Sequence, residues 1–202
     1  MMNSAESPQK TDIREHILAT GQRIMASKGY SAVGLNEILG EAGVPKGSFY
    51  HYFASKDAFG VAMLERYFSD YLSSMDGMLG HAQGTMQQRL MRYWQQWQET
   101  QSFQDCQGKC LAVKLGAEVA DLSEAMRLTL EKGTAAIVMR LTNAIKAGIA
   151  DGSLQTDETP EVVAESLYQL WLGASVMVKI VRNKGPFNTA MAVTQRALHV
   201  TS

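Results

Sequence analysis

Helix-breaking residues are rare in this chain, and their positions divide it into long segments. Four prolines occur in 202 residues, and three of them stand where a helix would begin or two helices would separate. Thr159, Pro160 and Glu161 follow the order of N-cap, first helical residue and first-turn acid. Pro45 opens another segment, and Pro186 separates the last two. No alternating run of β-branched and aromatic residues is long enough to predict a strand. The sequence therefore predicts an all-α fold.

Apolar residues recur at helical spacing along most of the chain. They predict helices over residues 11–28, 35–42, 45–51, 55–80, 87–101, 161–182 and 188–200, and a helix ending near residue 150 that opens on the capping-box pattern Asp121-Leu122-Ser123-Glu124. We expect a small N-terminal helix-turn-helix DNA-binding domain over residues 1–56. The long helix 55–80 would join it to a regulatory and dimerisation bundle over residues 57–202.

Composition excludes several classes of protein. The apolar fraction of 46% is too high for a disordered chain. The longest apolar run, residues 170–178, is far shorter than the ~20 residues that cross a bilayer. The polar start shows no signal peptide, and two cysteines cannot form a disulfide scaffold. We expect a cytoplasmic protein with no membrane association.

Catalytic signatures are missing from the sequence. It contains no Gly-x-Ser-x-Gly elbow, no His-Glu-x-x-His, no phosphate loop and no Gly-x-Gly-x-x-Gly. Acidic pairs such as Asp157 and Glu158 stand in polar turns, where solvation accounts for them. The sequence predicts no catalytic residue and no cofactor.

The most informative stretch lies between residues 35 and 56. Two short helices joined by a turn at Gly43 predict a helix-turn-helix. Its inward residues are apolar: Leu35, Ile38, Leu39, Val44, Phe49 and Phe53. Its outward residues are small, aromatic or hydrogen-bonding: Lys46, Gly47, Ser48, Tyr50, His51 and Tyr52. Backbone N–H groups of Gly47 and Ser48 can approach phosphate, and two or three side chains can reach base edges. A compact helical hairpin in a protein–protein adaptor is the alternative interpretation.

The run from Gly43 to Phe59, GVPKGSFYHYFASKDAF, closely resembles the signature of the TetR family of bacterial transcriptional repressors. The resemblance implies a homodimeric all-α repressor whose N-terminal unit binds double-stranded operator DNA. Its C-terminal bundle would bind a small-molecule inducer and dimerise.

The same resemblance assigns roles to individual residues. Lys46 and His51 would face the groove, while Ser48, Tyr50 and Lys56 would hold backbone phosphates. One departure is visible: the first helix of the motif opens on Val33-Gly34-Leu35, where family members usually have Thr or Ser. The resemblance therefore gives no support to a phosphate contact at that position.

The two cysteines, Cys106 and Cys110, lie four residues apart. A metal site would need about four ligands, and the histidines are scattered, so we predict none. One or both thiols can be buried small apolar residues. Alternatively, Lys109 and Lys114 lower the pKa of the Cys110 thiol, which then reacts with oxidants or carbon electrophiles. Whether Cys106 acts as a resolving thiol stays open, because an i, i+4 pair in one helix is poorly placed for a disulfide.

A second resemblance favours the reactive thiol. Residues 110–127 and 170–180 are similar to an electrophile- and oxidant-responsive branch of the TetR family. The resemblance implies that Cys110 is the sensor and that Lys179 lies beside it. From the residues alone, Lys179 is a helix-end cation that reaches solvent. A non-covalent inducer is the alternative, and the aromatic and Met residues of the bundle either line its pocket or form core: Trp94, Trp97, Phe103, Tyr168, Trp171 and Met177.

The charge of the chain bears on whether it can bind nucleic acid. The net charge of −1 counts, at first sight, against nucleic acid, and residues 1–60 hold equal numbers of bases and acids. The stretch from 42 to 56 is nevertheless free of acids, and a dimer would carry two copies of it.

The small residues Gly173, Ala174 and Ser175 let a partner helix approach, so we expect the last two helices to form the homodimer surface.

Overall fold

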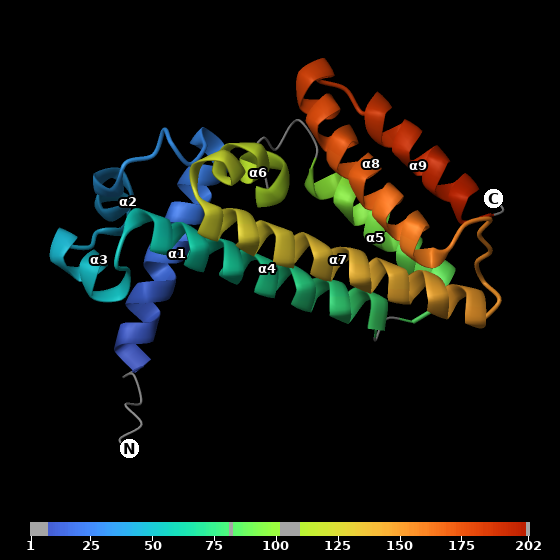
Figure 1. Cartoon of the computed structure of the whole chain (residues 1–202), viewed down its shortest axis with the longest axis horizontal. Helices are drawn as coiled ribbons and strands as arrows, with labels where there is room; N and C mark the ends of the chain where they lie inside the picture. The colour runs from blue at the N-terminus through green and yellow to red at the C-terminus, as the bar shows by residue number, and fades with distance from the viewer. Residues whose placement is uncertain (1–7, 81–82, 102–109, 201–202) are drawn as a thin grey trace.

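The computed structural model describes residues 8–80, 83–101 and 110–200. These residues form nine helices and no strand, which confirms the predicted all-α fold (Figure 1). The helices are α1 (Pro8–Lys28), α2 (Leu35–Ala42), α3 (Lys46–Tyr52), α4 (Lys56–Gly80), α5 (Met86–Thr100), α6 (Leu111–Leu122), α7 (Glu124–Ala150), α8 (Pro160–Val181) and α9 (Gly185–Ala197).

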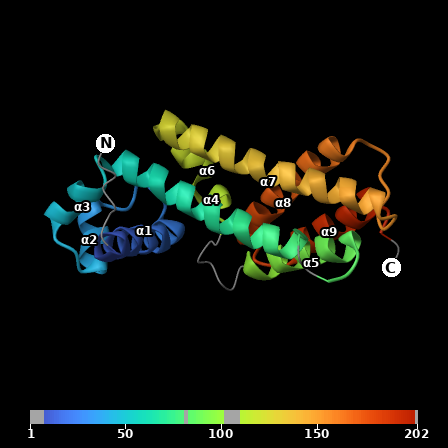
Figure 2. The same cartoon turned by 90° about the horizontal axis from the view of Figure 1, so that it is seen from below.

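Helices α4 and α7 run side by side along the length of the molecule (Figures 1 and 2). Helices α1, α2 and α3 gather at one end, and α5, α8 and α9 pack around the other. The two long helices approach closely at Gly133, where an added Cβ would lie 2.3 Å from the Phe68 ring. Helix α6 is short and lies between α1 and the start of α7 (Figure 1).

Local signals fix several helix ends as predicted. The Ser55 hydroxyl accepts from the Ala58 amide at 3.0 Å, and the Thr159 hydroxyl accepts from the Val162 amide at 3.4 Å. Gly29 ends α1 with a φ of 94°, which favours glycine.

One predicted cap is wrong, and one helix was not predicted as a separate element. Ser123, not Asp121, caps α7, since its hydroxyl accepts from the Met126 amide at 3.4 Å. Asp121 instead lies in the last turn of α6. Periodicity does not separate α6 from α7 because a single residue divides them.

The bundle core is built on stacked aromatic rings. Trp94 of α5 stacks on Trp171 of α8 at 4.9 Å between ring centroids, and Phe187 of α9 covers the other face of Trp171 at 5.7 Å. The Trp171 indole donates to the Thr194 hydroxyl at 2.9 Å. These contacts hold α5, α8 and α9 together. Among the described helices, none is long and apolar enough to cross a membrane.

Candidate functional site

Helices α2 and α3 form the predicted helix-turn-helix. Gly43 ends α2 in the left-handed region, with a φ of 63°. The amide of Val44 donates back to the Leu39 carbonyl at 3.0 Å, so the chain turns sharply. Pro45 then precedes the first residue of α3, and the Ser48 amide donates to its carbonyl at 2.9 Å. The turn thus fixes α3 in orientation relative to α2.

The inward face of this unit is fixed against α1 and α4. The apolar residues predicted to face inward are buried or packed against the core: Leu35, Ile38, Leu39, Val44, Phe49 and Phe53. The imidazole of His16 bonds to the carbonyl of Ala42 at 3.1 Å, and Arg14 lies 5.4 Å from the Phe53 ring centroid. Packing against α1 and α4 therefore holds α3 in a fixed position.

The outward face of α3 carries most of the predicted DNA contacts. Lys46, Gly47, Tyr50 and His51 are exposed, and the Tyr50 side chain is 57% exposed. Ser48 is half-buried. Tyr52 is less outward than predicted, since it is half-buried and packs against the core. The exposed surface of α3 is thus narrower than the sequence indicates.

The two acids of α2 are paired with bases of α1. Glu41 of α2 pairs with Arg23 at 3.0 Å, and Glu37 pairs with Lys28 at 2.5 Å. Neither pair involves Lys46. The face of α3 therefore keeps a local positive charge although the whole chain is nearly neutral.

Lys56, at the first position of α4, has partners within the chain. Its ammonium donates to the Tyr30 carbonyl at 2.9 Å and lies 4.4 Å from the Tyr30 ring centroid. The phosphate contact assigned to Lys56 by resemblance would have to be made from this half-buried position.

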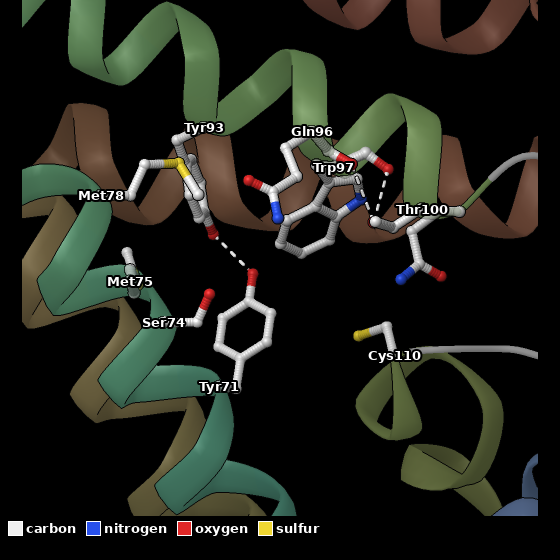
Figure 3. A pocket seen from close by; sticks show the side chains of 10 residues that line it. Tyr71, Ser74, Met75, Met78, Tyr93, Gln96, Trp97, Thr100 and Cys110 are labelled. Atoms are coloured by element: carbon white, nitrogen blue, oxygen red, sulfur yellow. Dashed lines mark hydrogen bonds between the residues drawn. The ribbon is translucent and has the colours of Figure 1, made fainter. Parts of the chain in front are cut away.

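A cavity of about 190 Å³ lies between α4, α5 and the start of α6. The hydroxyls of Tyr71 and Tyr93 bond to each other across it at 2.8 Å (Figure 3). Its lining is mixed aromatic, thioether and amide: Tyr71, Ser74, Met75, Met78, Tyr93, Gln96, Trp97, Thr100, Gln101 and Cys110. Cys110 projects into it from the beginning of α6 (Figure 3).

Cys110 is buried and its thiol is less acidic than predicted. Only 3% of the residue is exposed, and burial raises the pKa of the thiol above its ordinary value. The Tyr67 hydroxyl, the amides of Val113 and Ala112, and the charge of Lys179 lower it in part. The prediction of a lowered pKa is therefore wrong, because the sequence pattern of nearby lysines does not report the desolvation of the sulfur.

Four phenols surround the thiol. Burial raises the pKa of Tyr67, Tyr71, Tyr93 and Tyr168 above the ordinary tyrosine value, so all four keep their protons at neutral pH. The Tyr67 hydroxyl interacts with the Cys110 thiol, whereas the Tyr168 hydroxyl is buried without a hydrogen-bond partner among the described residues. The sulfur thus lies among protonated phenols.

The sequence identified only part of this cavity. Of the aromatic and Met residues proposed for a pocket, Trp97 lines it, Trp94 and Trp171 form core, and Met177 is exposed. Phe103, like Cys106, lies outside the described residues. Cavity-lining residues on α4 and α5 were missed, although on α4 Tyr71, Ser74, Met75 and Met78 recur at helical spacing on one face.

A helix-turn-helix presented at one end of a helical bundle, with a cavity inside that bundle, defines an all-α DNA-binding regulator. Comparison with known families agrees. Residues 17–63 match the family described as bacterial regulatory proteins of the tetR type, and residues 86–194 match the tetracyclin repressor-like C-terminal domain. The chain belongs to the TetR family, and it is a transcriptional repressor of the helix-turn-helix type.

Relatives match nearly the whole chain. The HTH-type transcriptional repressor NemR of Escherichia coli is 43% identical over 185 residues, covering 90% of this chain and 91% of NemR. The repressor DhaR of a Mycobacterium species is 33% identical, covering 94% and 93%. The crystal structure of reduced E. coli NemR superimposes with a TM-score of 0.89 at 41% identity, covering 95% of this chain and 99% of that one.

Proposed function

We propose that this chain is a homodimeric repressor that binds operator DNA through α3 and leaves it when Cys110 reacts with an electrophile or an oxidant. Residues 1–56 form the DNA-binding domain, and residues 57–202 sense and dimerise. The observation that carries the proposal is the position of Cys110, which lines a cavity of aromatic, thioether and amide side chains in a chain closely similar to NemR.

On the DNA side, the exposed face of α3 supplies the contacts. Lys46 and His51 read base edges in the major groove, which a short helix can do with two or three side chains. Tyr50, with the hydroxyl of Ser48 and the backbone at Gly47, bonds to phosphate, and Tyr52 supports the helix from its half-buried position. Lys56 adds a phosphate contact from the start of α4.

On the sensing side, the chemistry is attack by the Cys110 thiolate. With an α,β-unsaturated carbonyl compound, a carbon–sulfur bond forms, the carbon–carbon π bond opens, and the α-carbon takes a proton. A hydroxyl of the protonated Tyr71–Tyr93 pair or of Tyr67 donates that proton, and the phenolate left behind takes up the proton that the thiol lost on ionisation. With a peroxide, the sulfur gains an oxygen as the O–O bond breaks, giving a sulfenic acid and water or alcohol. Lys179 stabilises the thiolate in either case.

The adduct would act by taking up space in the cavity. The cavity of about 190 Å³ is small, and Cys110 is the N-cap of α6. A group attached to the sulfur must occupy the space between α4 and α5 or displace the start of α6. Either outcome changes how the bundle supports the N-terminal domain.

A non-covalent inducer in the same cavity is the second candidate function. One observation favours it: the side-chain oxygen of Gln101, which lines the cavity, is buried without a hydrogen-bond partner among the described residues. A ligand with an N–H or O–H donor would satisfy this oxygen. Such a ligand would bind reversibly and leave the mass of the chain unchanged.

The dimer surface follows from the exposed faces of α8 and α9. Apolar side chains on α8 are unusually open to solvent in one chain: Val162, Val176, Met177, Ile180 and Val181. Gly173 has open space where a side chain would stand. Packing α8 and α9 against the same helices of a second chain would cover this surface.

The experiment is a gel shift with the protein's own upstream DNA, followed by mass spectrometry of the treated protein. Before treatment we expect specific binding. After treatment with a maleimide we expect release, together with a single adduct that maps to Cys110. Release without any covalent adduct would support the non-covalent inducer, and the absence of specific DNA binding would refute the proposal.

A further inference from the structure

Glu118 joins the sensing helix to the N-terminal domain. Its carboxylate accepts two hydrogen bonds from successive backbone amides in the turn after α1, from Tyr30 at 3.1 Å and from Ser31 at 2.7 Å. An added Cβ at Gly29 would lie 3.0 Å from the same carboxylate, and its φ of 94° favours glycine. Residues 29–31 thus pack closely around the Glu118 carboxylate.

The electrostatics of the contact agree with its geometry. Partial burial raises the pKa of the Glu118 carboxyl, but the hydrogen bonds from Ser31 and Tyr30 and the charge of Lys114 outweigh burial. The pKa consequently lies below the ordinary glutamate value. Glu118 is ionised at neutral pH, and hydrogen bonds to an ionised acceptor are the stronger kind.

The turn after α1, which Glu118 holds, is also hydrogen-bonded to the start of α4, just after the helix-turn-helix. Lys56 donates to the Tyr30 carbonyl at 2.9 Å, and the Tyr30 hydroxyl donates to Asp57 at 3.3 Å. Lys56 and Asp57 begin α4, four residues after α3 ends at Tyr52. A displacement of Glu118 therefore reaches the α3–α4 junction through Tyr30.

The same helix begins at the sensor. Cys110 is the N-cap of α6, and its carbonyl accepts from the Lys114 amide at 3.1 Å in the first turn. Glu118 follows eight residues later on this helix, about 12 Å along its axis. A short helix moves as a unit, because each residue is bonded to the next turn.

We propose that Glu118 is the coupling residue through which reaction at Cys110 reaches the DNA-binding domain, by way of the turn at residues 29–31. The inference rests on the proposed function of Cys110. In the unreacted protein, the carboxylate holds the turn. When an adduct displaces the start of α6, the two bonds are lost and the α3–α4 junction loses its support.

The test compares Glu118→Gln and Glu118→Ala with Asp121→Asn, an exposed acid on the same helix. Operator Kd is measured before and after maleimide treatment, with the extent of Cys110 labelling determined on the same samples. In both Glu118 variants we expect labelling as in the unaltered protein and a starting Kd raised toward that of the labelled unaltered protein. The release factor, which is the Kd after labelling divided by the Kd before it, should be at least about fivefold smaller than in the unaltered protein. Asp121→Asn should behave as the unaltered protein.

Hydrogen exchange of the peptide covering residues 29–33 provides a second readout. We expect its exchange to rise on labelling of the unaltered protein and to be high before labelling in Glu118→Gln. Release factors within twofold of the unaltered protein in both Glu118 variants would overturn the coupling role. So would a starting Kd in these variants that is weaker than the Kd of the labelled unaltered protein, because Glu118 would then be part of the DNA-binding architecture itself. If the unaltered protein is labelled at Cys110 and is not released, the proposed sensor function fails first, and the coupling fails with it.

Discussion

The ammonium of Lys56 lies 4.4 Å from the centroid of the Tyr30 ring and donates to the carbonyl of the same residue at 2.9 Å. One side chain thus makes a cation–π contact and a charged hydrogen bond to the turn that Glu118 holds. Replacing it with Met keeps its length and removes both contacts. We expect Lys56→Met to lower the free energy of unfolding by about 1–2 kcal/mol, measured by urea denaturation.

The same variant separates two roles of Lys56. If it also contacts a phosphate in the operator complex, the slope of log K against log salt should become less negative by about two in Lys56→Met, because the dimer carries two Lys56 side chains. An unchanged slope would remove Lys56 from the phosphate contacts and leave it a structural residue.

The exposed face of α3 should carry operator recognition. We expect Lys46→Ala combined with Tyr50→Ala to abolish specific binding, because both side chains are exposed and extend beyond the supported base of the helix-turn-helix. The melting temperature should stay within about two degrees. With roughly 4–6 phosphates neutralised per dimer, the salt slope of the unaltered protein should be about −4 to −5. Specific binding that survives the double substitution would refute the assignment.

The burial of the Cys110 sulfur predicts a pH dependence of its labelling. Its pKa is raised above the ordinary thiol value of 9.0, so only the small thiolate fraction reacts at pH 7. The labelling rate should rise about tenfold per pH unit from pH 7 and still be rising at pH 9. A plateau below pH 8 would show a thiol of lowered pKa and contradict the burial argument.

Lys179 lowers the pKa of the Cys110 thiol, so replacing Lys179 with an uncharged residue should raise that pKa and slow labelling. We expect Lys179→Met to reduce the labelling rate at pH 7 by about two- to fivefold, measured by mass spectrometry at fixed reagent concentration. Lys184→Met is the matched control, since Lys184 is an exposed cation just beyond α8. Equal rates in the two variants would exclude an electrostatic role for Lys179.

The dimer surface can be tested at Gly173. An added Cβ there meets no atom of the rest of the described chain within 4 Å, apart from its own stretch of helix, so Gly173→Leu should leave the fold of the chain intact. In the proposed dimer it would block the approach of the partner helix. We expect sedimentation analysis to show a monomer and operator affinity to fall by at least about tenfold. The control is Gly77→Leu, at an equally open position on α4; a dimer in both variants would move the interface elsewhere.

The sequence predicted the helices well where a local signal marks their ends. Thr159 with Pro160, Ser55 and Gly29 each act through hydrogen bonds or backbone preferences within a few residues. The recognition helix was found in the same way, because Gly43 and Pro45 define its turn. Such features need no knowledge of distant contacts.

The proposed sensing site was predicted less completely, because its properties arise from residues far apart in the chain. The pKa of the Cys110 thiol is raised by burial and lowered in part by Tyr67 of α4 and Lys179 of α8, neither of which is its neighbour in sequence. The Glu118 contact spans 87 residues to Ser31. Both features require the packed bundle.

Release of the repressor from DNA by reaction at Cys110 is the central step of the proposed function. The direct measurement is fluorescence anisotropy of labelled operator DNA, titrated with the unaltered protein, Cys110→Ser and Cys106→Ser, each with and without maleimide. We predict that treatment releases DNA from the unaltered protein and from Cys106→Ser and leaves Cys110→Ser bound. Release from Cys110→Ser equal to that from the unaltered protein would contradict the account.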